Sequence, residues 1–328
     1  MRSLALIAAA LLACALLVAC GGDDDQSESR PPPVAKPEDF PSAEGKTLAE
    51  LRAELGSGGP VLAPSVSQLT TGENRFGFGL FDRSRAQIAN APAAVYVAPA
   101  GGGEARGPFP ARYESLEVSP QYQSRQTSTD PDAAKSVYVA DIPFEKPGTY
   151  DLLGIARLDD RLVAAASAAP GLTVVKAADD PIPGSGDPAP RIHTPTEADV
   201  GGDLASIDTR LPPSTMHNAD FAEVVGKKPV VLIFATPALC QSRVCGPVVD
   251  IAEEVKAGME GEDVEFIHME VFQDNQIAKG LRPQLLEYNL QTEPWVFTVD
   301  PKGKVAARFE GAFSSRELEE GIKKARGS

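Results

Sequence analysis

The sequence predicts an all-β sandwich domain followed by an α/β domain, behind an N-terminal export signal. Three observations lead to this fold class. The chain starts with a short apolar run. Its middle holds about seven short strand-like stretches separated by Gly, Pro and Asp turns, which is typical of a sandwich. Its last third alternates strand-like and helix-like segments, which indicates a largely parallel sheet covered by helices.

The composition excludes several classes of protein. The chain has 328 residues, which is long enough for two domains. It carries 46 acidic against 31 basic residues, a formal net charge of −15, so we expect no nucleic-acid partner. A hydrophobic content of 42% is ordinary for a globular protein and excludes a mainly disordered or collagen-like chain. Four cysteines are too few for a disulfide framework, so the position of each one matters more than their number.

The first twenty residues have the order of a bacterial lipoprotein signal. Arg2 precedes an apolar run over residues 4–19, as in a secretory signal. The run ends in Leu17-Val18-Ala19-Cys20, which resembles the lipoprotein box whose cysteine is lipidated and becomes the new N-terminus. The resemblance implies that residues 1–19, including Cys14, are removed. Acyl chains on Cys20 would then anchor the protein to the outer face of the cell membrane.

Residues 20–45 are expected to form a disordered tether, because three aspartates and three consecutive prolines leave little apolar surface to bury. The β-rich domain is expected over residues 46–176, opening with a short helix at 46–55. Its stretch 143–150 resembles an immunoglobulin-type corner, in which Tyr150 bonds back to the turn that precedes its strand. The domain holds no histidine and no cysteine, so we interpret it as a spacer or as a docking module for a partner protein. The expected strands cover residues 75–81, 94–97, 113–118, 136–142, 149–156, 162–166 and 172–175.

Residues 177–200 are rich in Pro and Gly and predict a linker. The α/β domain follows over residues 201–328, in the order β-α-β-α-β-β-α. Its strands are expected at 229–234, 264–271, 295–299 and 304–309, and its helices at 246–256, 281–290 and 314–325.

Two cysteines lie between the first strand and the first helix of this domain, and Glu293-Pro294 precedes its third strand. This pattern resembles the thioredoxin fold, and the export signal makes it most similar to the membrane-tethered thioredoxins of the TlpA/ResA type. The resemblance implies a thiol-disulfide oxidoreductase with Cys240 and Cys245 as its redox pair. It also implies that Pro294 is the cis-proline facing the sulfurs. In this family two residues separate the cysteines, whereas four do so here.

Either cysteine could be the nucleophile. Cys240 lies near the family spacing after the first strand, whereas Cys245 directly precedes Gly246-Pro247 at the expected start of the helix. The positive end of a helix dipole stabilises a thiolate, so Cys245 is expected to have the lower pKa. Glu293 is expected to disfavour a nearby thiolate and acidic substrates.

The functional hypothesis is an exported, lipid-anchored oxidoreductase that exchanges disulfides with protein thiols and disulfides, with no cofactor and no resident metal. One alternative is a non-catalytic binding or scaffold lipoprotein in which Cys240 and Cys245 form a structural disulfide. Another is copper handling of the SCO type, since two thiolates suit Cu(I). That family also uses a distant histidine late in the fold, and no histidine follows His268. His268 is expected to be a hydrogen-bonded core residue, and His193 to lie in the linker without a role.

Overall fold

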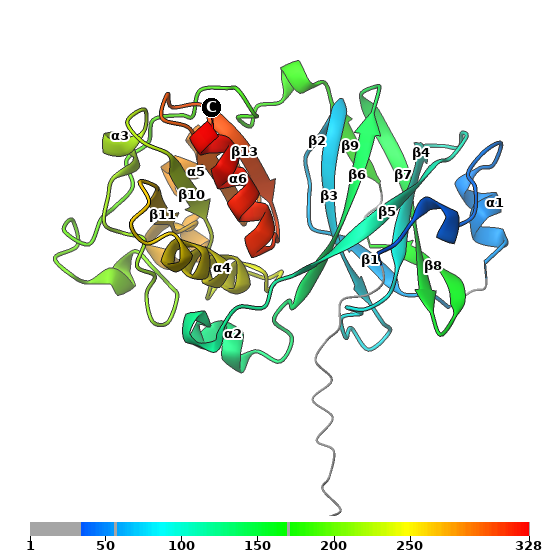
Figure 1. Cartoon of the computed structure of the whole chain (residues 1–328), viewed down its shortest axis with the longest axis horizontal. Coiled ribbons are helices and arrows are strands. Elements are labelled where there is room, and N and C mark those ends of the chain that lie inside the picture. The colour runs from blue at the N-terminus through cyan, green and yellow to red at the C-terminus, as the bar shows by residue number, and fades with distance from the viewer. Residues whose placement is uncertain (1–33, 56–57, 169–170, 328) are drawn as a thin grey trace, which may run out of the picture. The chain divides into compact units, whose positions relative to one another are not determined.

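The computed structural model describes residues 34–55, 58–168 and 171–327, and these residues belong to one compact unit. They form a nine-stranded sheet in the N-terminal part and a four-stranded sheet in the C-terminal part (Figure 1). The predicted signal, the lipidation residue Cys20 and the start of the tether lie outside the described residues. In the part of the chain that is described, no helix is both long and apolar enough to cross a membrane.

The nine-stranded sheet closes on itself. Strands β7, β4, β5, β6, β3, β1 and β8 pair in that order and β8 pairs again with β7, while β9 and β2 extend from β7. The predicted immunoglobulin-like sandwich is therefore not confirmed, because these strands form one barrel-like sheet instead of two packed sheets. The strands are β1 (Val61–Pro64), β2 (Leu69–Thr70), β3 (Gly72–Phe81), β4 (Ala93–Pro99), β5 (Arg106–Ser115), β6 (Ser136–Phe144), β7 (Gly148–Leu158), β8 (Arg161–Ser167) and β9 (Leu172–Val175).

Long strands cause the closure. β5 pairs with β4 through its first half and with β6 through its second half, and Ala111 is the residue where the partner changes. The barrel interior is filled by buried aromatic and aliphatic side chains, including Phe78 and Tyr138, whose rings stack at 5.6 Å between centroids. The predicted tyrosine corner is present: the Tyr150 hydroxyl donates to the Lys146 carbonyl at 2.9 Å.

Part of the predicted tether is folded. Phe40 and Ala43 are buried together with Leu51 and Tyr96 on the barrel, so residues 34–45 are not the solvated spacer that their composition indicated. The Tyr96 hydroxyl also donates to the Pro41 carbonyl at 2.7 Å, which helps to hold this proline-rich segment. The predicted helix that follows is α1 (Leu48–Ala53), capped by the Thr47 side chain.

The predicted linker is also packed. Ile182 and Ile192 are buried in the C-terminal core. The backbone of this segment pairs with the C-terminal sheet, since Gly186 N–H donates to the Val305 carbonyl at 2.8 Å. Residues 177–200 therefore cover an edge of the sheet, which a linker rich in Pro and Gly was not expected to do.

The C-terminal part has the predicted element order and a thioredoxin-like fold. Its strands lie in the order β11-β10-β12-β13, with β10 parallel to β11 and antiparallel to β12, and β12 and β13 form the expected hairpin. Val231 and Ile233 pack with residues of α4 and α6 in one core cluster, while Leu232 and Phe234 belong to the cluster on the other face. The elements are β10 (Val230–Phe234), α4 (Cys245–Gly258), β11 (Glu265–Met269), α5 (Pro283–Glu287), β12 (Trp295–Val299), β13 (Val305–Glu310) and α6 (Ser315–Gly327).

Shorter helices join these layers. The two remaining α-helices are α2 (Arg125–Thr129), between β5 and β6, and α3 (Phe221–Val224), before β10. The short 3-10 helices are Pro37–Asp39, Pro120–Tyr122, Ala177–Asp179, Leu204–Ser206, Gln273–Asn275 and Ile277–Lys279.

The barrel and the thioredoxin-like part share a packed and charged interface. Glu317 of α6 is buried and pairs with Arg75 of β3 at 2.7 Å and with Arg112 of β5 at 3.1 Å. Gly311 has a positive φ of 74°, and a Cβ at this position would lie 2.2 Å from the Ser65 carbonyl oxygen. A glycine is therefore required where the barrel backbone approaches the end of β13.

Candidate functional site

The two cysteines of the folded part lie at the start of α4. Cys245 is the first residue of α4 and is fully buried, whereas Cys240 lies in the preceding loop and is partly exposed. Both are free thiols. Their sulfurs and a carboxylate oxygen of Glu293 all lie within 4.8 Å of one another. The structure thus brings together the two cysteines and the residue that precedes Pro294.

Cys240 is the more acidic thiol. A hydrogen bond from the Cys245 thiol contributes most, and the Ser242 hydroxyl at 3.2 Å and the backbone N–H groups of Cys245 and Val244 add to it. These donors outweigh burial and lower the pKa of Cys240 to about 6. A thiol with this pKa is mostly ionised at neutral pH and can act as a nucleophile.

The prediction that Cys245 would be the more acidic cysteine is wrong. Burial raises the pKa of Cys245 well above its usual value, and the neighbouring Cys240 raises it further. The unpaired N–H groups of a helix point out from its first turn, so they stabilise an anion in front of the helix. Cys240 occupies that place, while the Cys245 side chain lies inside the apolar cluster behind it.

Glu293 and Pro294 face this pair. The Glu293–Pro294 peptide bond is cis, as the family resemblance implied. The Pro294 carbonyl accepts a hydrogen bond from Gly311 N–H at 2.9 Å, which ties the proline to the end of β13. Burial and then the charge of Cys240 raise the pKa of Glu293. Glu293 in turn raises the pKa of Cys245, which agrees with the expectation that its charge disfavours a nearby thiolate.

The loop between the cysteines is held by the barrel domain. Arg243 has a positive φ of 58° and forms ion pairs with Asp130 and Asp132, and its carbonyl accepts from Ala134 N–H at 3.3 Å. These partners lie more than 100 residues earlier in the chain, so no local pattern could predict them.

A cleft borders the same loop. It has a volume of about 1140 Å³. One wall carries Gln241 and Glu293, and the other belongs to the barrel, with Ser65, Gln87 and Lys135. The barrel domain, in which the sequence showed no chemistry, therefore lines the approach to the cysteine pair.

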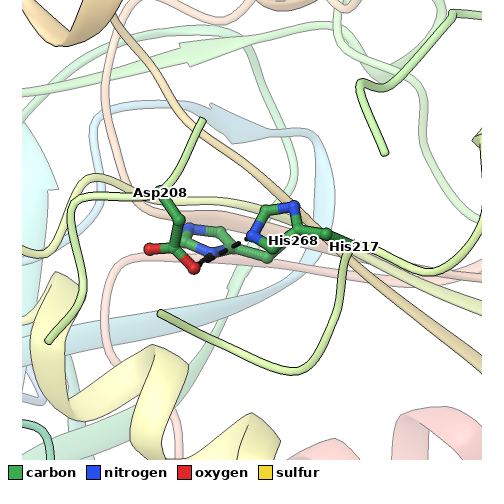
Figure 2. A group of neighbouring side chains, drawn as sticks. All are labelled: Asp208, His217 and His268. Carbon is green, nitrogen blue, oxygen red and sulfur yellow. Dashed lines mark hydrogen bonds and ion pairs between the residues drawn. The ribbon is translucent and has the colours of Figure 1, made fainter. Parts of the chain in front are cut away.

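A second polar cluster is buried in the C-terminal part of the chain. Asp208, His217 and His268 converge in the interior, as Figure 2 shows. The Asp208 carboxylate lies 2.9 Å from His217 Nε2 and 3.3 Å from His268 Nδ1. His268 is hydrogen-bonded in the core, as predicted, and its Nε2 lies 3.0 Å from the Ala235 carbonyl oxygen. Burial lowers the pKa of His268, but Asp208 outweighs burial and raises it to about 9.

The sequence did not predict this cluster. Its members lie up to 60 residues apart, and the only available signal was that both buried histidines neighbour a methionine, in Met216-His217 and His268-Met269. His193, by contrast, is exposed and pairs with Asp220 at 2.6 Å.

Comparisons with known proteins add a structural likeness. No protein-family model matches the chain, and no curated protein matches it. Among solved structures it is similar to a chain described as a thiol:disulfide interchange protein, a thioredoxin family protein from Chlorobium tepidum TLS. The sequence identity is 15%, the match covers 42% of this chain and 94% of that chain, and the TM-score is 0.30. The thioredoxin-like assignment rests on the strand order, the cysteine loop and the cis-proline described above.

Proposed function

We propose that the protein is an exported, lipid-anchored thiol-disulfide oxidoreductase that acts on protein substrates through Cys240 and Cys245. The observation that carries the proposal is the asymmetry of the pair. Cys240 is partly exposed with a pKa lowered to about 6, and its neighbour Cys245 is buried with a raised pKa. An exposed nucleophile next to a protected resolving thiol is the arrangement that reversible exchange needs.

In the reducing direction, the Cys240 thiolate attacks one sulfur of a substrate disulfide. The substrate S–S bond breaks, a mixed disulfide with Cys240 forms, and one substrate thiolate leaves. Cys245 then loses its proton and attacks the Cys240 sulfur, which forms the Cys240–Cys245 disulfide and releases the second substrate thiolate. Two electrons pass from the protein to the substrate, and the released thiolates take up protons. The oxidising direction is the reverse.

The second step needs a group that accepts the Cys245 proton. Glu293 lies within 4.8 Å of both sulfurs, and its raised pKa makes it a better proton acceptor than an ordinary carboxylate. We assign it this role. Pro294, held against Gly311, would keep the Glu293 backbone next to the sulfurs, where an extended substrate segment can lie in the cleft.

Lipidation of Cys20 would place this chemistry at the outer face of the membrane. The support is the sequence of the signal and its box. Metabolic labelling with a fatty acid should label the wild-type chain and leave Cys20→Ala unlabelled. An unlabelled wild-type chain that fractionates with soluble proteins would exclude the anchor.

Trapping of substrates tests the exchange reaction. Cys245→Ser leaves the mixed disulfide on Cys240 unresolved, so we expect it to accumulate covalent adducts that a reductant releases. Cys240→Ser is the matched control and should trap nothing. Equal adduct yields from both variants, or a wild-type chain that does not reduce insulin with dithiothreitol as the electron source, would reject the proposal.

A specific observation also favours copper handling as a second candidate. Two thiols and a carboxylate oxygen converge within 4.8 Å, and thiolates bind Cu(I) well. Stoichiometric Cu(I) binding by the reduced chain, together with no disulfide exchange, would favour it. If both measurements are negative, the scaffold alternative is supported.

A further inference from the structure

The buried cluster around Asp208 contains four potential ligand atoms. Asp208, Ser214, His217 and His268 are each at most 2% exposed. The Ser214 hydroxyl oxygen lies 3.2 Å from His217 Nε2 and 3.2 Å from His268 Nδ1. Together with the Asp208 carboxylate oxygen, which lies at 2.9 and 3.3 Å from the same two nitrogens, these atoms form a compact group.

Hydrogen bonds among these four side chains do not satisfy every polar atom of the group. Asp208 Oδ2 already accepts from Ser214 N–H at 2.6 Å and from the two imidazoles, whereas Oδ1 accepts from Arg210 N–H at 2.7 Å. If both ring nitrogens donate to Asp208, Oδ2 accepts three hydrogen bonds at once and the Ser214 hydroxyl proton has no acceptor within this group of four residues. If one ring nitrogen is unprotonated, its lone pair faces a carboxylate oxygen at about 3 Å, which is repulsive in a buried site.

We propose that Asp208, His217 and His268, completed by the Ser214 hydroxyl, bind one divalent transition-metal ion of the zinc class. Zinc takes nitrogen and oxygen ligands at about 2.0–2.2 Å, so tetrahedral ligand atoms lie about 3.2–3.6 Å apart. Three of the four distances given above, between 3.2 and 3.3 Å, fall within this range. The Asp208–His217 distance is shorter, at 2.9 Å, and would have to widen slightly.

The surroundings suit a metal site. Histidine ligands usually donate their second ring nitrogen to a carbonyl or a carboxylate, and His268 Nε2 has the Ala235 carbonyl at 3.0 Å. Glu270 is buried nearby and has one carboxylate oxygen without a hydrogen-bond partner among the described residues. With Asp208 it supplies two negative charges, which match a divalent cation.

The ion would be structural. All four side chains are buried, so no substrate reaches them. The segment that carries Asp208 also supports the cysteine loop, because the Thr209 hydroxyl accepts from Ala238 N–H at 3.1 Å. The ion would connect this segment to β11 and to Ala235 at the end of β10, directly before the loop that carries Cys240.

The test uses the full chain with serine in place of all four cysteines, Cys14, Cys20, Cys240 and Cys245, so that thiolates cannot contribute and failure of the redox proposal does not affect the result. After refolding with Zn²⁺ and gel filtration, we expect about one zinc per chain by mass spectrometry of the metal. His217→Gln should lose at least 90% of that zinc. His193→Gln, which changes the exposed His–Asp pair, should keep it.

A second measurement uses only the parent chain, so it does not require that a histidine variant folds. Co²⁺ refolded into the same chain should give visible absorption bands of tetrahedral nitrogen and oxygen coordination without a thiolate charge-transfer band. The proposal is overturned if the folded parent chain holds less than about 0.1 zinc per chain and gives no such spectrum. It is also overturned if folded His217→Gln binds zinc as the parent does. In either case the cluster is a metal-free hydrogen-bonded triad.

Discussion

Replacing Cys245 by alanine should raise the pKa of Cys240. The Cys245 thiol is the largest contributor to the low pKa of Cys240, ahead of the Ser242 hydroxyl and the backbone N–H groups of α4. Cys245→Ala removes that donor and leaves the others in place. Because Cys245 is buried in an apolar cluster, alanine introduces no new polar group there.

The size of the change follows from the strength of the lost hydrogen bond. A hydrogen bond to a charged group contributes about 1.5–3 kcal/mol, and a thiol is a weak donor, so the low end applies. Since one pKa unit corresponds to about 1.4 kcal/mol, the pKa of Cys240 should rise by about one unit, from about 6 to about 7. Ser242→Ala removes a smaller contribution and should shift the pKa less.

The assay is the pH dependence of thiolate absorbance near 240 nm and of the rate of iodoacetamide alkylation. The chain should carry serine at Cys14 and Cys20, so that Cys240 is the only thiol that ionises between pH 5 and 8. A wild-type midpoint near 8.5, the usual value of a free cysteine, would refute the reasoning. So would an unchanged midpoint in Cys245→Ala, because the thiol–thiolate hydrogen bond would then contribute nothing.

Three further predictions concern stability. The lowered pKa of Cys240 stabilises the reduced fold fully above its unfolded pKa, and this contribution is lost as pH falls through about 6. The Tm difference between the reduced wild type and Cys240→Ser should therefore widen from pH 5 to 9, and a constant difference would contradict this. Glu317→Ala leaves Arg75 without its buried carboxylate partner, whereas Arg112 keeps Glu114, and should cost about 3 kcal/mol in chemical denaturation; a loss below about 0.5 kcal/mol would contradict this. Phe40→Ala should cost about 3 kcal/mol in the same assay, and a loss below about 0.5 kcal/mol would mean that residues 34–45 act as a free tether after all.

The sequence predicted the thioredoxin-like part well because its signals are local. The strand over Trp295–Val299 agrees in both bounds, and the last helix starts close to its predicted first residue, where Ser314 Oγ accepts from Glu317 N–H at 3.3 Å. The acidity of the cysteines could not be predicted in the same way. It depends on which sulfur lies in front of the first turn of α4, and that depends on the path of the loop.

The barrel and the packed segments depended on distant contacts. Periodicity indicated seven of the nine strands, but β1 and β2 are short, and nothing local shows that β8, which forms a hairpin with β7, also pairs with β1. Residues 177–200 have the composition of a linker, yet two buried isoleucines, backbone hydrogen bonds and the Arg308–Asp180 ion pair dock them. Composition describes an average over a segment, whereas docking depends on single side chains.

The ion pairs of Arg243 give a reason for the unusual spacing of the cysteines. Four residues between Cys240 and Cys245, in place of two, make a loop long enough for Arg243 to reach Asp130 and Asp132 on the other domain. The spacing thus lets ion pairs connect the cysteine loop to the barrel. A fragment of residues 201–328 lacks both aspartates, so its cysteine loop is no longer held by the ion pairs of Arg243. Thiol properties measured on that fragment would therefore not represent those of the full chain.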